Sequence, residues 1–374
     1  MSSTTQYSRN VSWTLMRPLE HFYPSVSAVW HHTLVSAVSM TTGERADGGN
    51  PTACASKSTC PARCQCDTGE QHEEEASISC ERAGLMSVPH DVPCDVRSMF
   101  LRGNALRMLP PGALPPLLFL RRLSLAHNNL TFIAPDAFQG VPALLWLSLS
   151  HNIDLGILHA RALSGLQVLQ TLILAACRLH DLPQRLFAPT HGLTHLHLWD
   201  NRLRRIPGAL RILSRLTHLY LEDNAIEVVA SSSLLGLENL TLLDLQDNYI
   251  SVIHEEAFIS CNKLTSLNLA NNHLLSLPAN AFHGLNQLQV LNLGGNQLLE
   301  VPQACLFGLV SLHTLHLEHN RVKEFPLAVY DALPLLHTLH LQGNWLSSLS
   351  PPNSITATAL RTLYLFDNPW HCDC

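Results

Sequence analysis

The chain has 374 residues, of which 6% are aromatic and 14% charged, and its formal net charge at pH 7 is −6. A negative charge without a Lys/Arg cluster excludes a basic stripe for nucleic acid or for an anionic membrane surface. The 22 histidines nearly equal the 23 lysines and arginines, so full protonation would carry the charge from −6 to −6 + 22 = +16. We therefore expect an electrostatic partner to be held in a pH-dependent way.

Residues 1–59 precede the first regular pattern. Their one candidate apolar stretch, VSAVWHHTLVSAVS (26–39), is interrupted by His31 and His32 and starts late, so it is a poor signal peptide. This part is predicted to be an atypical leader or a disordered N-terminal segment. The chain has no run of about 18 apolar residues, so no membrane span is predicted within it.

The cysteines gather at the two ends of the remaining chain. Such clusters at the ends of a repeat array indicate disulfide-stapled caps and an oxidising compartment, and residues 60–95 are predicted to be the N-terminal cap. A zinc site at Cys60, Cys64 and Cys66 is the alternative, but no second paired cluster offers the remaining ligands. The clusters are Cys54, Cys60, Cys64, Cys66, Cys80 and Cys94, then Cys372 and Cys374, with Cys177, Cys261 and Cys305 between them. Spacing alone assigns no partner to Cys54, Cys94, Cys372 or Cys374.

From Val96 onward one template recurs: apolar, two variable, Leu, variable, Leu, two variable, Asn, variable, apolar. The ninth positions are 24 residues apart in nine of eleven cases, with one spacing of 25 and one of 23. This is the leucine-rich-repeat pattern, and residues 96–367 are predicted to form twelve repeat segments. The ninth position is filled by Asn104, Asn128, Asn152, Cys177, Asn201, Asn224, Asn248, Asn272, Asn296, Asn320, Asn344 and Asn368.

Each Leu-x-Leu is predicted to be a short strand with both leucines in the core, and strands stacked about 4.8 Å apart form a parallel sheet. The predicted fold is an α/β solenoid, a curved horseshoe with a parallel concave sheet and a mostly irregular convex side. At the turn off each strand, the Asn amide can bond to backbone groups that would otherwise lack partners. Cys177, the exception, is interpreted as a tolerated buried residue rather than a reactive thiol.

The outer half of each copy carries a proline near its start and usually an aromatic residue further on. Proline is expected to exclude a regular strand or helix there, and the aromatic ring is expected to pack inward. The prolines are Pro110, Pro183, Pro207, Pro278, Pro302 and Pro326, and the aromatic residues are Phe138, Phe187, Phe258, Phe282, Phe307 and Tyr330.

The ends of a solenoid are apolar and need covers. CPARCQC followed by Cys80 supplies the first, and NPWHCDC begins the second. Residues 368–374 are therefore interpreted as the start of a truncated C-terminal cap, and the chain as a truncated product or a fragment.

From Cys60 to Cys374 these motifs resemble the extracellular leucine-rich-repeat proteins with cysteine-rich caps. The resemblance implies a secreted or cell-surface protein with disulfides Cys60–Cys66 and Cys64–Cys80. One local detail is similar to the Nogo receptor (reticulon-4 receptor) group: a repeat with an extra residue, SHNIDLGIL, is followed by one in which Cys replaces Asn, LAACRL. That group also has a sequon ahead of a strand, as at Asn239. CPARCQC equally resembles the start of the lamprey variable lymphocyte receptors.

Template positions 3, 5 and 7 project from the concave face, because positions 4 and 6 face the core. Exposed aromatic side chains on a rigid concave surface are typical of protein-binding hot spots, although leucine-rich strands also tolerate almost any residue there. The candidate ligand-binding residues are Trp146, His195, His197, Trp199, His218, Tyr220, Glu222, Asp244 and Gln246, with Leu242 among them. Flanking Asp200, Asp223 and Asp247 make the rim acidic, so a basic protein surface is the natural complement.

A second histidine group lies in the last two full copies: His313, His316, His337 and His340. His316 and His340 should be stacked neighbours, which raises metal binding, but a site needs three or four converging ligands. No metal and no cofactor are predicted. Nor is an enzyme predicted, because the sequence has no G-x-S-x-G, P-loop or H-E-x-x-H motif and an open sheet offers no water-excluding pocket.

Sequons occur at Asn10, Asn129 and Asn239, of which the last two are the expected glycosylation sites. Together these features predict an extracellular protein-recognition module, a cell-surface receptor or adhesion protein that binds a protein ligand on its concave face. A soluble matrix, carrier or innate-immune recognition protein without a signalling role is the alternative.

Overall fold

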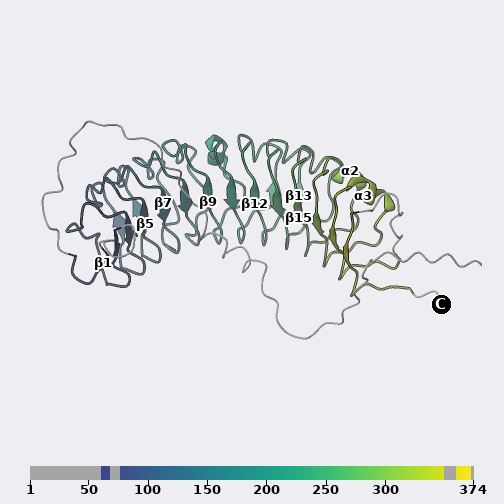
Figure 1. The fold of residues 1–374 in the computed structure, drawn as a ribbon, viewed down its shortest axis with the longest axis horizontal. Coiled ribbons are helices and arrows are strands. Elements are labelled where there is room, and N and C mark those ends of the chain that lie inside the picture. Colours follow the sequence, from purple (N-terminus) through teal and green to yellow (C-terminus); the bar gives the residue numbers. More distant parts are fainter. Residues whose placement is uncertain (1–59, 68–75, 349–358, 372–374) are drawn as a thin grey trace, which may run out of the picture.

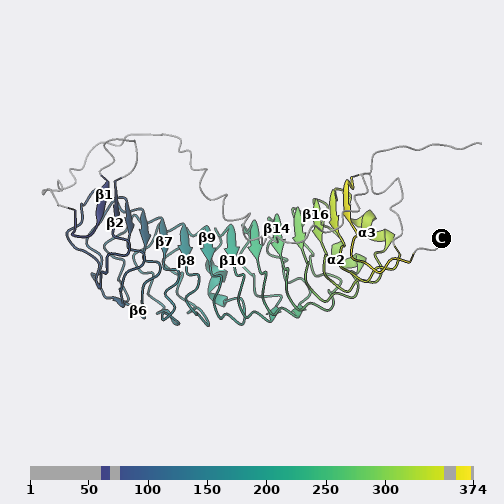
Figure 2. The same ribbon diagram turned by 90° about the horizontal axis from the view of Figure 1, so that it is seen from below.

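Each copy of the repeat contributes one three-residue strand to a single sheet in the computed structural model, which describes residues 60–67, 76–348 and 359–371. The turns stack side by side into a curved solenoid, and the strands lie in one row on its inner side (Figures 1 and 2). In spatial order the 14-stranded sheet contains β1 (Gln65–Asp67), β2 (Ser77–Ser79), β3 (Ser98–Phe100), β5 (Arg122–Ser124), β7 (Trp146–Ser148), β8 (Thr171–Ile173), β9 (His195–His197), β10 (His218–Tyr220), β12 (Leu242–Asp244), β14 (Ser266–Asn268), β15 (Val290–Asn292), β16 (Thr314–His316), β17 (Thr338–His340) and β18 (Thr362–Tyr364). All neighbours are parallel except β1 and β2, which are antiparallel.

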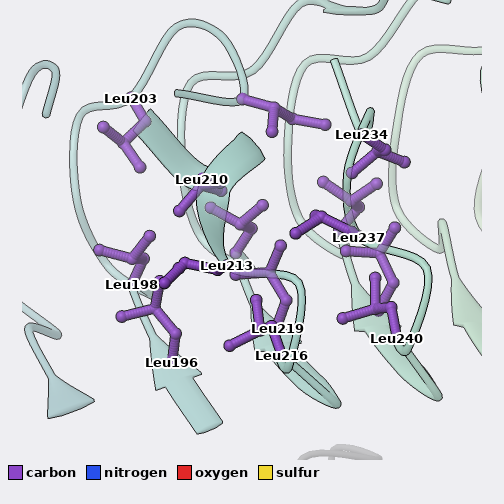
Figure 3. Close-up of a cluster of buried hydrophobic side chains, with 14 of the residues drawn as sticks. Leu196, Leu198, Leu203, Leu210, Leu213, Leu216, Leu219, Leu234, Leu237 and Leu240 are labelled. Atoms are coloured by element: carbon purple, nitrogen blue, oxygen red, sulfur yellow. The ribbon is translucent and has the colours of Figure 1, made fainter. Parts of the chain in front are cut away.

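The core follows from the register of this sheet. Leu219 of β10 pairs with Leu196 of β9 and with Leu243 of β12, so leucines at template position 4 lie in rows across the strands. These residues are fully buried, as are the position 6 leucines such as Leu198. Figure 3 shows leucines of neighbouring turns packing against one another. Because each turn buries its apolar face only against the next, the solenoid has one continuous core.

The convex side has little regular structure, as expected. It contains two short parallel pairs, β4 (Met108–Leu109) with β6 (Phe132–Ile133) and β11 (Val228–Val229) with β13 (Val252–Ile253). It also contains the 3-10 helix η1 (Gly208–Ile212) and the short helices α2 (Gln303–Leu306) and α3 (Leu327–Ala332).

The expectation that proline excludes helix from this side is wrong for three turns. η1, α2 and α3 each begin directly after a proline: Pro207, Pro302 and Pro326. Proline disrupts a helix interior, but its fixed φ and missing N–H are compatible with a helix start.

A buried column of asparagines connects successive turns. Asn272 Nδ2 donates to the carbonyl oxygens of Leu245, Leu269 and Ala270 at 3.0 to 3.1 Å, and its Oδ1 accepts the Ile250 N–H at 2.9 Å. The other column asparagines repeat these bonds from turn to turn. Backbone groups at the turn are thereby satisfied away from water.

Cys177 fits the column as a weaker substitute. Its thiol donates to the carbonyl oxygens of Leu149 at 3.2 Å and Ala175 at 3.3 Å, and the residue is fully buried. Burial raises the pKa of this thiol to about 12. A thiol with such a pKa is inert, which agrees with a tolerated buried residue.

One aromatic assignment is wrong. The rings of Phe138, Phe187, Phe258 and Phe282 are fully buried, and Tyr330 is nearly so, but Phe307 is 56% exposed. The inward position lies ten residues after the column residue, and in this turn it is Leu306 that lies there, fully buried in α2.

The N-terminal cap is closed by disulfides Cys60–Cys66 and Cys64–Cys80, the pairing that the resemblance implies. Cys94 is also disulfide-bonded. The predicted leader (1–59), Asn10, Cys54, Cys372 and Cys374 lie outside the described residues. At the other end Trp370 packs against the core and donates from Nε1 to the Leu365 carbonyl at 3.1 Å.

The curved solenoid with a parallel inner sheet confirms the predicted fold class. In the part of the chain that the structure describes, no helix has the length and apolar composition of a membrane span.

Candidate functional site

The candidate residues lie where strand alternation places them, on the inner face of β7 to β12. Their side chains are half-buried: none is packed in the core and none is fully exposed. Trp146 is separated from the rest, because Thr171 of β8 lies between it and His195 in the register of the sheet. Trp199 contacts the edge of the His151 ring, with centroids 5.9 Å apart.

Two pairs of rings stack across β9 and β10. His195 and His218 have centroids 4.4 Å apart at an interplanar angle of 12°, and His197 and Tyr220 are 4.4 Å apart at 7°. Strands in a sheet are about 4.8 Å apart, so the rings are closer together than their backbones. Inward curvature of the sheet favours this closer spacing, and the stacked rings form a continuous aromatic surface. We name these four residues the aromatic cluster.

Two histidines of this cluster have lowered pKa values. Burial, and then the neighbouring His218, lowers the pKa of His195 to about 4, and burial also lowers the pKa of His218. Each Nδ1 lies 2.9 Å from the hydroxyl of the preceding threonine, Thr194 or Thr217. The charge reversal near pH 6 that the composition predicts therefore does not extend to His195, and at His218 protonation is shifted to lower pH.

Acidic groups lie beside the aromatic cluster. Asp244 accepts hydrogen bonds from the Gln246 N–H at 3.0 Å and from Asn268 Nδ2 at 3.3 Å. Gln246 donates from Nε2 to Asp247 at 2.6 Å, so its amide is already engaged. In Glu222, by contrast, Oε2 is buried and has no hydrogen-bond partner.

This arrangement disfavours negative charge. Burial, followed by the charge of Asp244, raises the pKa of Glu222, and burial also raises the pKa of Asp244. A guanidinium or ammonium group placed here would donate to the free Glu222 oxygen and favour the ionised form of both carboxyl groups.

A hollow adjoins these groups on the C-terminal side, and the repeat pattern alone does not predict it. Tyr220 and Asp244 line one end of it, and His316 and Glu318 line the other. The signal in the sequence is the run of small side chains at projecting positions of β14 and β15. The residues between the two ends include Ser266, Asn268, Val290 and Asn292.

The second histidine group separates into two stacks. His316 lies on His340 with centroids 4.2 Å apart, and His340 lies on Tyr364 at 4.4 Å. His313 and His337 form a different stack, with centroids 5.1 Å apart. The four histidines therefore do not converge on one point.

The His316–His340 stack has a carboxylate beside it. Glu318 Oε1 lies 3.2 Å from His316 Nδ1. Burial acts to raise the pKa of Glu318, but the hydrogen bond and charge of His316 outweigh it and lower the pKa. Burial, and then His316, lowers the pKa of His340 to about 4.

The two sequons differ in their surroundings. Asn129 is exposed, whereas Asn239 is half-buried and donates from Nδ2 to the Ser214 carbonyl at 2.7 Å. Lys263 Nζ lies 2.6 Å from Asn239 Oδ1. Glycan attachment at Asn239 therefore has to accommodate two existing hydrogen bonds, and Asn129 is the less hindered acceptor.

Comparison with known proteins identifies the class. The leucine rich repeat family model matches residues 95–153, 119–179, 167–226, 214–274 and 262–322, a region that covers 95–322 continuously. The chain belongs to the leucine-rich-repeat family, whose members are protein-interaction modules and not enzymes.

The curated relatives are extracellular members of this family. It is similar to mouse (Mus musculus) nyctalopin, 46% identical over 172 residues, which are 46% of this chain and 36% of nyctalopin. It is also similar to Reticulon-4 receptor-like 1 of Rattus norvegicus, 32% identical over 38% of this chain and 31% of that protein. Trophoblast glycoprotein of Macaca fascicularis is 30% identical over 48% of this chain and 53% of its own length. The matches thus span about a third to a half of these relatives.

Solved structures agree on the fold. A chain of the TLR13–ssRNA13 complex superposes with a TM-score of 0.67 at 28% identity, covering 76% of this chain and 42% of that one. A chain of the octameric complex of Latrophilin 3, Unc5D and FLRT2 gives a TM-score of 0.68 at 23% identity, covering 77% and 86%.

Proposed function

We propose that this protein is a cell-surface receptor or adhesion protein that recognises a protein ligand on its concave face. The contact surface comprises the aromatic cluster with Trp199, Glu222, Asp244 and Gln246, and Trp146 at its N-terminal margin. Extracellular relatives, one of them named a reticulon-4 receptor-like protein, support the class. A secreted or surface location, with glycans at Asn129 and Asn239, belongs to the same proposal.

The observation that carries the proposal is the pair of cross-strand ring stacks beside desolvated carboxyl groups. His195 on His218 and His197 on Tyr220 present flat, preorganised surfaces that contribute nothing to the leucine core. Rigid aromatic groups bind with little loss of side-chain entropy, which is why Tyr and Trp are enriched in hot spots. The surface is therefore suited to binding rather than to folding.

The carboxyl groups indicate a basic partner. Glu222 Oε2 lacks a hydrogen-bond donor, and Asp244 lies beside it on the neighbouring strand. An arginine or lysine from the ligand would supply both the donor and the opposite charge. A nucleic acid is disfavoured here, because its phosphates would face these carboxyl groups.

A binding experiment with paired variants tests the proposal. The full chain, tetramerised through a tag, is applied to cells that each display one secreted or cell-surface ectodomain. For an ectodomain that binds, His197→Ala with Tyr220→Ala is expected to weaken affinity at least tenfold, since two hot-spot residues each cost about 1 kcal/mol or more. Raising the salt concentration should weaken binding of the unaltered chain as well.

The chain offers a matched control. Tyr249 and His273 form another Tyr–His ring pair, with centroids 5.5 Å apart, which lies after the column asparagines and off the strands of the sheet. Tyr249→Ala with His273→Ala should leave the affinity unchanged. Equal affinities of both double variants and the unaltered chain would place the binding surface elsewhere.

A further inference from the structure

Three potential metal ligands meet on the concave face of β16 and β17. Each of His316, Glu318 and His340 offers one ligand atom, and these atoms all lie within 4.8 Å of one another. Within residues 60–67, 76–348 and 359–371, this is the one group of three such residues found. The third ligand removes the objection raised by the sequence, in which two histidines alone were too few.

The separations approach those of a zinc site. Zinc bonds of about 2.0 to 2.1 Å in a tetrahedron place neighbouring ligand atoms about 3.3 Å apart. His316 Nδ1 and Glu318 Oε1 are already 3.2 Å apart. The three ligand atoms all lie within 4.8 Å of one another. Because the His316 and His340 rings are stacked, each ring has to rotate out of the stack before both nitrogens can point at one ion.

The surroundings of Glu318 favour a cation. Its second oxygen, Oε2, is buried and has no hydrogen-bond partner, and the same is true of Gln342 Oε1 in the following turn. Gly294 leaves room for this carboxylate, since a Cβ at that position would lie 2.9 Å from Glu318 Cδ and Oε1. Buried acceptor oxygens without a donor are costly, and a cation bound at the Glu318 carboxylate would offset part of that cost.

The other histidine stacks do not share this chemistry. His313 Nδ1 and His337 Nδ1 each lie 2.6 Å from a backbone carbonyl oxygen, and no carboxylate joins them in a three-ligand group. Stacking of imidazoles therefore does not by itself define the site. The difference is the carboxylate of Glu318.

We propose that His316, Glu318 and His340 bind one divalent transition-metal ion of the zinc class on the concave face. Two imidazole nitrogens and one carboxylate oxygen are a ligand set typical of zinc. Three protein ligands leave a fourth position, which faces the hollow between this group and Tyr220 and takes water or a donor atom of a bound partner. The proposal does not depend on the aromatic cluster being a binding surface.

Zinc titration of the full chain tests the site without any partner. After treatment with chelator and dialysis, calorimetry with ZnCl₂ is expected to show one ion bound per chain, and bound Co²⁺ should give the visible absorption of a tetrahedral site. Glu318→Gln removes the charge but keeps the shape. His340→Phe keeps a ring between His316 and Tyr364 but removes the nitrogen.

Each of these variants is expected to weaken zinc binding at least tenfold. His337→Phe is the control, because His337 directly precedes β17 and also belongs to a histidine stack. This variant should bind zinc with the affinity of the unaltered chain. Circular dichroism confirms that each variant is folded. Absence of zinc binding by the unaltered chain, or equal affinities of His340→Phe and His337→Phe, would overturn the proposal.

Discussion

At the scale of single residues, the column asparagines connect successive turns, because their side-chain amides form the hydrogen bonds that backbone groups at each turn would otherwise lack. Asn272 makes four hydrogen bonds to backbone groups of two turns while only 2% exposed. The residue before each column position adopts a positive φ, between 51° at Asp247 and 73° at Gly103. Gly, Asn, Asp and His tolerate that region best, which explains why they dominate this position.

Replacement of a column residue should therefore be costly. Asn272→Ala leaves the Ile250 N–H and several carbonyl oxygens without this partner, and we expect a loss of about 3 kcal/mol in the free energy of unfolding. Urea denaturation followed by circular dichroism measures it. Asn286→Ala, at an exposed asparagine of the outer side, should change stability by less than about 0.5 kcal/mol. Similar midpoints for the two variants would contradict the role given to the column.

The raised pKa of Glu222 predicts a dependence of stability on pH. Burial and then Asp244 raise this pKa above its ordinary value of 4.5, so the folded chain binds the proton more tightly than the unfolded chain. The resulting stability is complete below the unfolded-state pKa and is lost as pH rises through the folded-state pKa. Glu222→Gln should remove about 1 kcal/mol of the decline between pH 5 and pH 8, the amount of roughly one pKa unit.

Urea midpoints at the two pH values measure this effect. Glu238→Gln provides the control, because Glu238 is exposed on the outer half of the same turn. It should leave the pH dependence as it is in the unaltered chain. An unchanged decline in Glu222→Gln would show that Glu222 ionises normally in the folded chain.

At the scale of elements, alternate residues of each strand have different roles: one side chain packs in the core, and its neighbours project from the concave face. In β10, Leu219 is fully buried whereas His218 and Tyr220 project from the concave face. We expect Leu219→Ala to lower the free energy of unfolding by about 3 kcal/mol, and His218→Ala by less than about 1 kcal/mol. Denaturation midpoints of these neighbouring variants test the division, and comparable losses would mean that the ring stack also supports the fold.

The predictable part of the fold is the part that repeats. Leu196 and Leu198 could be assigned to the core because every turn has the same alternation, and the cross-strand neighbours His195 and His218 followed from the 23-residue spacing. Phe307 was misassigned because inward packing depends on distance from the column residue, which Leu306 satisfies.

The site was less predictable, because it depends on side-chain geometry between turns. Glu318 lies at a projecting position two residues after His316, but only the structure brings its oxygen to 3.2 Å from the imidazole. The hollow arises from small residues such as Ser266 and Asn292, whose effect depends on the larger side chains at either end. Pattern alone gives the direction of a side chain and not its rotamer.

At the scale of the whole molecule, the solenoid is divisible by turns. Deletion of residues 249–272 removes one complete period and joins Asn248 to His273, so the column and the strand register are preserved. We expect this variant to fold cooperatively with a modest loss of thermal stability, since interactions reach only between neighbouring turns. Deletion of residues 249–260 leaves half a turn and should prevent folding of the adjoining repeats. Circular dichroism melting distinguishes them, and equal behaviour would contradict a modular core.

The regular spacing of one strand per turn also restricts how a ligand with its own regular period can lie along the concave face. Along the curve the side chains recur about every 4.8 Å, whereas the turns of an α-helix recur every 5.4 Å. A helical ligand aligned with the curve would drift by about 0.6 Å per strand and lose step with the strands after only a few of them. A regular helix therefore matches the strands better when it crosses them obliquely, whereas an irregular loop has no fixed period and can follow the curve.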